Sequence, residues 1–270
     1  MNLTMLVPVF GTLGACTALL EGSKDLEFLN LSGKKLRDDD IVAISKRESL
    51  KKLKMENCAL SWMDKTPQGE QKCRADLRLL GNLKCLEELT FHSTRLEDED
   101  IQAISGLENL RRLEMRGCDL DGADLMPLSA LRHLEELDVS GNLLTQVTRF
   151  EANRDDSSIK NDIQAISGIV NLKKLVMQSC ALGRFETIYL PRQVTLRHDQ
   201  VDLRPLGALK YLEELDVSWA VLSEDNVQAI LGLKNLKKLV VLYCGLRSEN
   251  IRSLRALPHL KELVGWDQQG

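Results

Sequence analysis

The sequence predicts an α/β solenoid, with a curved parallel sheet on its concave face and short helices or turns on its convex face. Two observations support this prediction. The frame L-x-x-L-x-L-x-x-x-x-L, with Met, Phe or Val allowed at the sixth place, recurs along the chain. Each copy also joins a short alternating stretch to a segment with helical spacing. One copy alone cannot bury both of its apolar edges, whereas stacked copies bury them against each other.

Nine copies of the frame begin at leucines, and the basic step between them is 24 residues. Three of the copies are lengthened, by 12, 14 and 16 residues. Eight copies keep the full frame, whereas the ninth has Gly265 at the sixth place. The copies begin at Leu26, Leu50, Leu86, Leu110, Leu134, Leu172, Leu212, Leu236 and Leu260.

Each copy contains one stretch typical of a strand and one compatible with a short helix. In residues 110–120, Leu113 and Met115 alternate with charged residues, which predicts a half-buried strand. In residues 97–110, Ile101 and Ile104 have the spacing of one helix face, although a run of turns would also fit. Acidic residues at the start of this segment favour a helix N-terminus. Residues 223–230 add a capping serine.

This pattern resembles the leucine-rich repeat family, over about residues 17–270. The resemblance implies one strand and one returning segment per copy, with the parallel strands lining the concave face. Alternate copies carry cysteine at the ninth frame position, where the family usually has Asn or Cys turned inward. Lys34 and Ala220 depart from this, so we expect looser turns there. The cysteines at this position are Cys58, Cys118, Cys180 and Cys244.

We expect residues 1–25 to be a degenerate repeat or capping segment and residues 26–270 to form one repeat domain. The three insertions all begin after the eleventh frame position, which places them along one rim. They occupy residues 61–76, 145–162 and 183–202. The third is rich in strand formers on both sides of Pro-Arg-Gln, which predicts a small hairpin.

The N-terminus has two interpretations. Residues 1–20 are apolar and uncharged, and Leu3 and Leu6 fit a worn copy of the frame, which we favour. Residues 13–16 instead resemble a bacterial lipoprotein cleavage box with Cys16 as the lipid acceptor. Buried thiols point to a reducing compartment, so we expect a cytoplasmic protein. A secreted or surface-anchored protein is the alternative if residues 1–16 are a signal.

Composition and motifs argue against several function classes. The net charge of -4 provides no basic field for nucleic acid or anionic membranes, and no segment suits a membrane span. Motifs for zinc, phosphate loops and common hydrolases are absent, so we expect no metal, cofactor or catalytic residues. An enzyme built around His198 and Asp199 is a weaker hypothesis. The histidines are scattered at His92, His133, His198 and His259.

Charge alternates at the third frame position, which faces the concave side. Equivalent residues of neighbouring parallel strands lie about 4.8 Å apart, so opposite charges attract there and like charges repel. We interpret the alternation as a ladder that keeps the face soluble and opposes slippage by one copy; a stripe that binds a charged ligand is the alternative. The residues run Phe28, Lys52, Glu88, Arg112, Glu136, Lys174, Glu214, Lys238 and Glu262.

Large apolar residues appear at the seventh and eighth frame positions of the last three copies, where earlier copies have small or polar residues. Val240 and Val264 likewise replace polar residues at the fifth position. A clustered apolar patch often marks a binding site, and Trp and Tyr are frequent anchors. The alternative is end packing around the last copy. The four residues expected on or near one surface are Trp219, Leu242, Tyr243 and Trp266.

The sequence therefore predicts a non-enzymatic scaffold that binds a protein partner of unknown identity. The expected site combines the C-terminal concave face with the third insertion, including Phe185 and Tyr189. Two alternatives stay open: an adhesion protein of internalin type tethered by its N-terminus, and a substrate receptor of a ubiquitin ligase. No F-box or RING pattern is present, so a ligase role would need another chain. The uncapped ninth copy also allows oligomerisation through the C-terminal edge.

Overall fold

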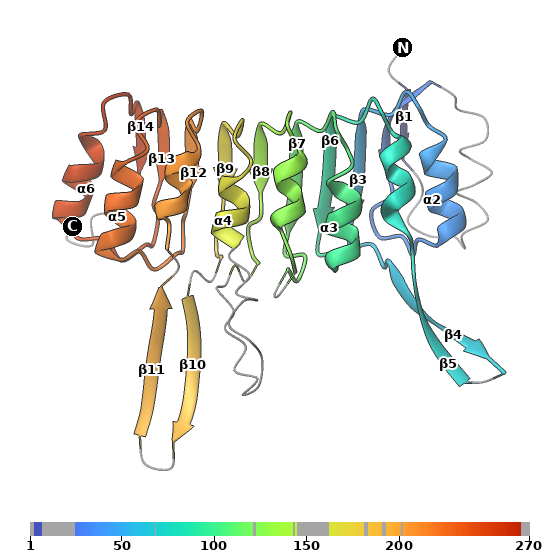
Figure 1. Cartoon of the computed structure of the whole chain (residues 1–270), viewed down its shortest axis with the longest axis horizontal. Helices are drawn as coiled ribbons and strands as arrows, with labels where there is room; N and C mark the ends of the chain where they lie inside the picture. The colour runs from blue at the N-terminus through green and yellow to red at the C-terminus, as the bar shows by residue number, and fades with distance from the viewer. Residues whose placement is uncertain are drawn as a thin grey trace.

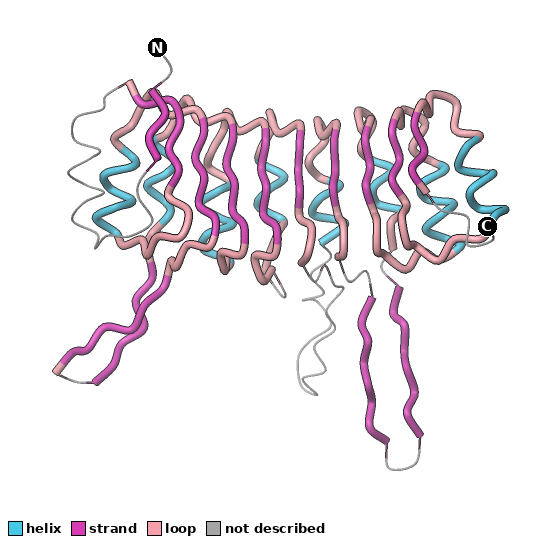
Figure 2. Tube along the Cα trace, turned by 180° about the vertical axis from the view of Figure 1, so that it is seen from behind, coloured by secondary structure: helices cyan, strands magenta, loops and turns pink. Residues whose placement is uncertain are grey.

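The computed structural model describes residues 3–6, 25–67, 69–120, 123–142, 144, 162–180, 183–190, 193–200 and 202–265. These residues form one long parallel sheet on one side and a row of helices on the other (Figures 1 and 2). The strands lie in sequence order across the sheet. They are β1 (Leu3–Leu6), β2 (Leu26–Asn30), β3 (Lys52–Glu56), β6 (Glu88–His92), β7 (Arg112–Arg116), β8 (Glu136–Asp138), β9 (Lys174–Val176), β12 (Glu214–Asp216), β13 (Lys238–Val240) and β14 (Glu262–Val264).

Strand register follows the leucine frame. The third residue of one copy lies opposite the third residue of the next, as Lys52 lies opposite Glu88 and Lys174 opposite Glu214. The fourth-position leucine of each paired copy points into the core; Leu113 is one example, at 0% exposed. Because adjacent copies share one register, the leucines form a continuous core between the sheet and the helices.

Two kinds of convex element alternate along most of the solenoid. Return segments with the pattern D-I-Q-A-I-S, as in residues 100–105, form α-helices. Return segments with the pattern D-L-x-x-L, as in residues 124–128, form 3₁₀ helices, and two of these have proline in the first turn. The helix α6 breaks this alternation. The α-helices are α2 (Asp38–Ser45), α3 (Asp98–Ile104), α4 (Asp162–Ser167), α5 (Glu224–Leu231) and α6 (Ser248–Arg255); the 3₁₀ helices are η1 (Leu77–Asn82), η2 (Met126–Ala130) and η4 (Arg204–Ala208).

The expected serine cap is present at α5. Ser223 Oγ accepts a hydrogen bond from the backbone N–H of Asn226 at 3.1 Å. This bond satisfies one of the N–H groups that a helix start leaves without an intrahelical partner. Among the described residues, no helix is both long and apolar enough to span a bilayer.

Two of the insertions form antiparallel hairpins. The third consists of β10 (Gly183–Leu190) and β11 (Gln193–Gln200), so the hairpin predicted from its strand formers is confirmed. The first also forms a hairpin, β4 (Ser61–Thr66) with β5 (Gly69–Arg74), which the sequence did not lead us to expect. Both hairpins extend from the same edge of the solenoid (Figure 1). The second insertion lies outside the described residues apart from Asp162.

The N-terminal strand β1 extends the sheet. It runs parallel to β2, with Leu3 opposite Leu26, but a register shift after Leu3 puts Met5, not the expected Leu6, opposite Leu29. Residues 13–16, including Cys16, lie outside the described residues.

The ninth frame position is buried as the resemblance implied. The thiol of Cys118 donates to the backbone oxygen of Phe91 at 3.4 Å, and the other three cysteines of this column make equivalent bonds. Lys34 and Ala220, where we expected looser turns, are also buried, and their N–H groups keep turn bonds to the third residue before them. The four cysteines of this column therefore link their copies to the preceding ones through polar contacts beneath the sheet.

Candidate functional site

The predicted charge ladder is present, and it resolves into separate ion pairs. Third-position side chains of consecutive copies meet two by two, for example Arg112 with Glu136 at 2.8 Å. These pairs are partly exposed, so each contributes about 0–1 kcal/mol. The pairs are Lys52–Glu88 at 2.9 Å, Arg112–Glu136 at 2.8 Å, Lys174–Glu214 at 3.6 Å and Lys238–Glu262 at 3.1 Å.

A second ladder runs along the second frame position, which the sequence interpretation overlooked. Glu135 lies between two cations, with Arg111 at 2.9 Å and Lys173 at 2.9 Å. The hydrogen bond from Lys173 is the main cause that lowers the pKa of the Glu135 carboxyl below its ordinary value. Lys237 likewise meets Glu213 at 2.6 Å. Most charges along the two ladders therefore already have partners within the chain.

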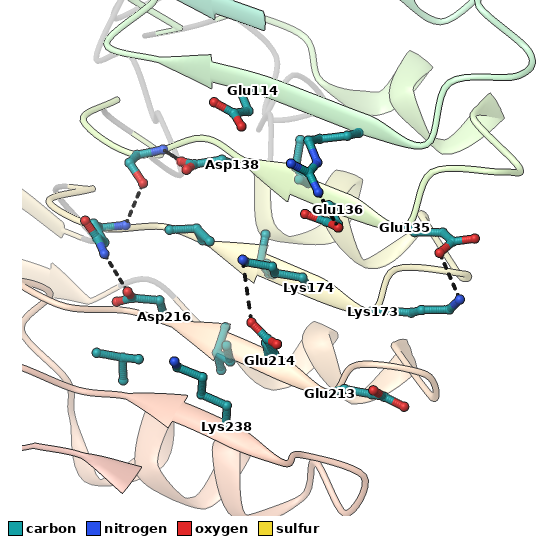
Figure 3. Close-up of a pocket in the computed structure, with 18 of the residues that line it drawn as sticks. Glu114, Glu135, Glu136, Asp138, Lys173, Lys174, Glu213, Glu214, Asp216 and Lys238 are labelled. Atoms are coloured by element: carbon teal, nitrogen blue, oxygen red, sulfur yellow. Dashed lines mark hydrogen bonds and ion pairs between the residues drawn. The ribbon is translucent and has the colours of Figure 1, made fainter. Parts of the chain in front are cut away.

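The C-terminal half of the concave face is hollowed, over about 810 Å³, across β7 to β14 (Figure 3). Fifth-position residues line its floor, where carboxylates and valines come together from successive strands. Asp138 is held by Arg116, whose Nε lies 2.7 Å from Oδ2. Val176 belongs to this row with Val240 and Val264, although the sequence interpretation named only the last two.

Trp219 and Tyr243 form a stacked pair in the turns that directly follow β12 and β13. Their ring centroids lie 4.1 Å apart at an interplanar angle of 24°. Both side chains are largely exposed, Trp219 at 59% and Tyr243 at 58%. Leu242, in the same turn as Tyr243, is half-buried. We refer to Trp219 and Tyr243 below as the aromatic pair.

The remaining predicted site residues are placed less fully. Phe185 and Tyr189 belong to β10, where they lie opposite His198 and Val194, and their side chains are not described. Trp266 lies outside the described residues. The structure thus brings Trp219 and Tyr243 together, with Leu242 beside them in the chain.

The aromatic pair occupies an unusual backbone position. The eighth frame residue adopts a left-handed conformation, and Trp219 and Tyr243 have φ values of 65° and 57°. Bulky residues rarely adopt this conformation, which costs an L-residue about 1–2 kcal/mol. The six earlier copies carry only Gly, Asn or Ser there. These residues are Gly33, Asn57, Ser93, Gly117, Gly141 and Ser179.

Hydrogen bonds between copies impose this conformation. The N–H of Trp219 donates to the backbone oxygen of Leu242 at 2.8 Å. The N–H of Ser179 likewise donates to the backbone oxygen of Ser218 at 2.8 Å. The pairing of the copies therefore continues into the turns and fixes their backbone whichever side chain is present. Strained residues of this kind persist only where the surrounding structure over-determines them, and they are frequent at functional sites.

The aromatic pair and the β10–β11 hairpin belong to the same edge of the sheet. The hairpin begins shortly after β9, and the turn of Trp219 follows β12, which pairs with β9 in parallel. Because the carboxyl ends of parallel strands meet at one edge, the base of the hairpin and the aromatic pair are neighbours there. Figure 1 shows the hairpin leaving the solenoid at this edge.

A second hollow, of about 720 Å³, lies at the opposite ends of the C-terminal strands. It is rich in lysines, including Lys210 and Lys261, and contains the exposed ring of Tyr211. Among the described residues, no group of three or more His, Cys, Asp or Glu side chains is arranged to hold a metal ion.

Solved structures with a similar fold are leucine-rich repeat proteins. Internalin C2 from Listeria monocytogenes matches 93% of this chain and 84% of its own, with 18% identity and a TM-score of 0.58. The chain has the leucine-rich repeat fold. Internalin F of that organism matches 92% of this chain and 64% of its own, with 18% identity and a TM-score of 0.52.

A third leucine-rich repeat structure is TLR13 in complex with ssRNA13. It matches 94% of this chain and 30% of its own, with 21% identity and a TM-score of 0.59. A scan of protein-family models gives no match, and no curated protein matches either. Because identities are this low, the leucine-rich repeat comparison concerns the fold, and function has to be argued from the surface.

Proposed function

We propose that this protein is a non-enzymatic scaffold whose protein partner docks on the aromatic pair and the C-terminal concave face. One observation carries the proposal. Two large rings stay exposed at left-handed backbone positions where the six earlier copies have Gly, Asn or Ser. Their exposure means that they contribute little to the core, so folding alone does not account for them. Trp and Tyr are the residues most often found as interface anchors.

The neighbouring elements support the same surface. The β10–β11 hairpin stands at the edge that carries the aromatic pair, and we include Phe185 and Tyr189 of β10 in the surface. We also include Trp266, the seventh frame residue of the ninth copy, which lies outside the described residues. Although TLR13 is found with an RNA, a net charge of -4 and largely paired cations favour a protein partner here.

We place the scaffold in the cytoplasm, because four thiols are buried in its core, as suits a reducing compartment. Mass spectrometry of the N-terminal peptide of the native protein tests this. A peptide that contains residues before Cys16 is expected. A chain that begins at a lipid-modified Cys16 would instead support the surface-anchored, internalin-type alternative.

The experiment for binding is a pull-down from lysate of the native cells, with the wild type compared with Trp219→Ser/Tyr243→Ser. Circular dichroism first establishes that both proteins are folded. A protein recovered only by the wild type is the expected result. A second variant, Trp266→Ser, tests whether the surface reaches the ninth copy.

Tyr211→Ser is the matched control, because Tyr211 is an equally exposed aromatic at the other end of the strands. It should recover the partner as the wild type does. Equal recovery by the wild type and the Trp219→Ser/Tyr243→Ser variant would contradict the proposal and assign the aromatic pair to end packing.

A further inference from the structure

Asp216, the last residue of β12, lies between two valines in the sheet. In the strand register its neighbours are Val176 of β9 on one side and Val240 of β13 on the other. All three are half-buried and line the 810 Å³ hollow. A carboxylate with aliphatic surface on both sides is an environment that a long cationic side chain can complement, since its stem is apolar and its head charged.

The Asp216 carboxylate is held in place by neutral donors. Oδ1 accepts from the backbone N–H of Ser218 at 2.9 Å and from its hydroxyl at 2.7 Å. Oδ2 accepts from the side-chain amide of Gln178 (Figure 3). A carboxylate offers about four acceptor sites, so a further donor can still be received. The negative charge is thus fixed in direction before any partner arrives.

No cation among the described residues neutralises Asp216. The lysines nearest in the frame, Lys174 and Lys238, are engaged with Glu214 and Glu262. Asp138, which occupies the equivalent position two copies earlier, is bound by Arg116. Asp216 is therefore a fifth-position carboxylate that is held in place without a cation among the described residues.

We propose that Asp216 receives a lysine or arginine side chain of an extended partner segment, with the stem of that side chain against Val176 and Val240. The inference rests on the proposed protein-binding function and names the partner chemistry of that surface. The aromatic pair begins three residues further along the chain, so the same segment can continue onto exposed rings that also favour cations.

The charge arrangement selects a basic segment over a phosphate backbone. Phosphates would approach Asp216 against its charge and would find the nearest lysines engaged. The lysine-rich hollow lies before the strands, and the three residue steps from Glu213 to Asp216 span about 10 Å. An anion bound there would not reach Asp216.

Selection of random short peptides displayed on phage, against the immobilised full chain, tests the inference. Peptides enriched in Arg or Lys are expected from the wild type. A synthetic copy of the best peptide should bind Asp216→Asn at least about tenfold more weakly. Replacing its basic residue by Gln should weaken binding to the wild type by a similar factor and have little further effect on Asp216→Asn.

Glu214→Gln is the matched control, because it removes the same charge from the same strand but from a carboxylate already paired with Lys174. It should change binding by less than about twofold. Equal losses in Glu214→Gln and Asp216→Asn would overturn the inference, since they would reflect net charge alone.

Other outcomes separate this inference from the proposed function. Selected peptides without basic enrichment that still require the aromatic pair would overturn the role of Asp216 and leave protein binding intact. Failure to select any peptide would also count against Asp216, while the pull-down would still decide protein binding. Tight binding of labelled oligouridine that Asp216→Asn leaves unchanged or strengthens would overturn the inference in favour of RNA.

Discussion

Asn142 joins two copies beneath the sheet by bonding to the backbone around Cys118. Its Oδ1 accepts the N–H of Cys118 at 2.8 Å, and its Nδ2 donates to the backbone oxygen of Met115 at 2.6 Å. Asn142 is 2% exposed. Thr94 makes the corresponding bonds to Cys58 and Met55. Asn and Thr at this position therefore satisfy backbone groups that water cannot reach.

Asn142→Ala should lower the free energy of unfolding by about 2–4 kcal/mol, because it leaves a buried N–H and a buried carbonyl without partners. Urea denaturation followed by circular dichroism measures this. Asn235→Ala is the control: the Asn235 side chain also donates to a backbone oxygen of another copy, at 2.7 Å, but is exposed. It should cost less than about 1 kcal/mol, and equal losses would contradict the explanation.

Replacing Trp219 or Tyr243 by Asn should change the free energy of unfolding by less than about 1 kcal/mol. Asn relieves the strain of a bulky residue in the left-handed backbone conformation. This gain offsets the lost stacking of the rings, which is worth about 0.5–1.5 kcal/mol. Asn57 already occupies the same position in the second copy. Leu215→Ala, in the core beside this turn, should cost about 2–5 kcal/mol. A comparably large loss for Trp219→Asn would show that the ring is structural.

A double-mutant cycle of Arg112→Ala and Glu136→Ala should give a coupling of about 0.5–1 kcal/mol at low salt. The pair is close, at 2.8 Å, but both side chains are more than a third exposed. The coupling should shrink at about 1 M NaCl, where screening is strong. Arg112 with Glu214, three strands away on β12, is the control cycle and should give no coupling. A salt-independent coupling would contradict a surface ion pair.

Native labelling with N-ethylmaleimide should discriminate between the cysteines. Burial raises the pKa of Cys118 and Cys180 to about 12, and that of Cys58 and Cys244 to about 11. The thiolate is the reactive form, so these four should label only after unfolding. Cys85, which is exposed, should label rapidly. Peptide mapping reads each site separately, and rapid native labelling of Cys118 would contradict the prediction.

The same shifts predict a loss of stability at alkaline pH. Unfolded thiols ionise near pH ~8.5, whereas the folded ones keep their protons to about 11 or 12. The contribution of the buried thiols to the free energy of unfolding is complete below the pKa of the unfolded thiols. It is lost as the pH rises above that pKa, by up to about 1.4 kcal/mol per thiol and pH unit. Urea denaturation between about pH 8 and pH 10 should show this fall. Cys118→Ser/Cys180→Ser should give a shallower slope; an unchanged slope would contradict the prediction.

Several features of this protein follow from the sequence because they depend on spacing along the chain. The leucine frame predicted both the core and the strand register, since side chains alternate across a strand and copies repeat the same frame. The alternating signs at Arg112 and Glu136 predicted their ion pair for the same reason. The cysteine column was expected to be buried because the resemblance to leucine-rich repeats implies an inward side chain at this frame position.

Other features were decided only by the tertiary structure, because they depend on how neighbouring copies meet. A bond between copies holds Trp219 in a left-handed backbone, and the stacking of the copies brings its ring into contact with that of Tyr243. The pairing of Glu135 with two cations, and the lack of a described cation at Asp216, depend on distances across strands. The sequence by itself thus determined the solenoid and its third-position charge ladder, whereas the packing of copies decided which charges and rings remain for a partner.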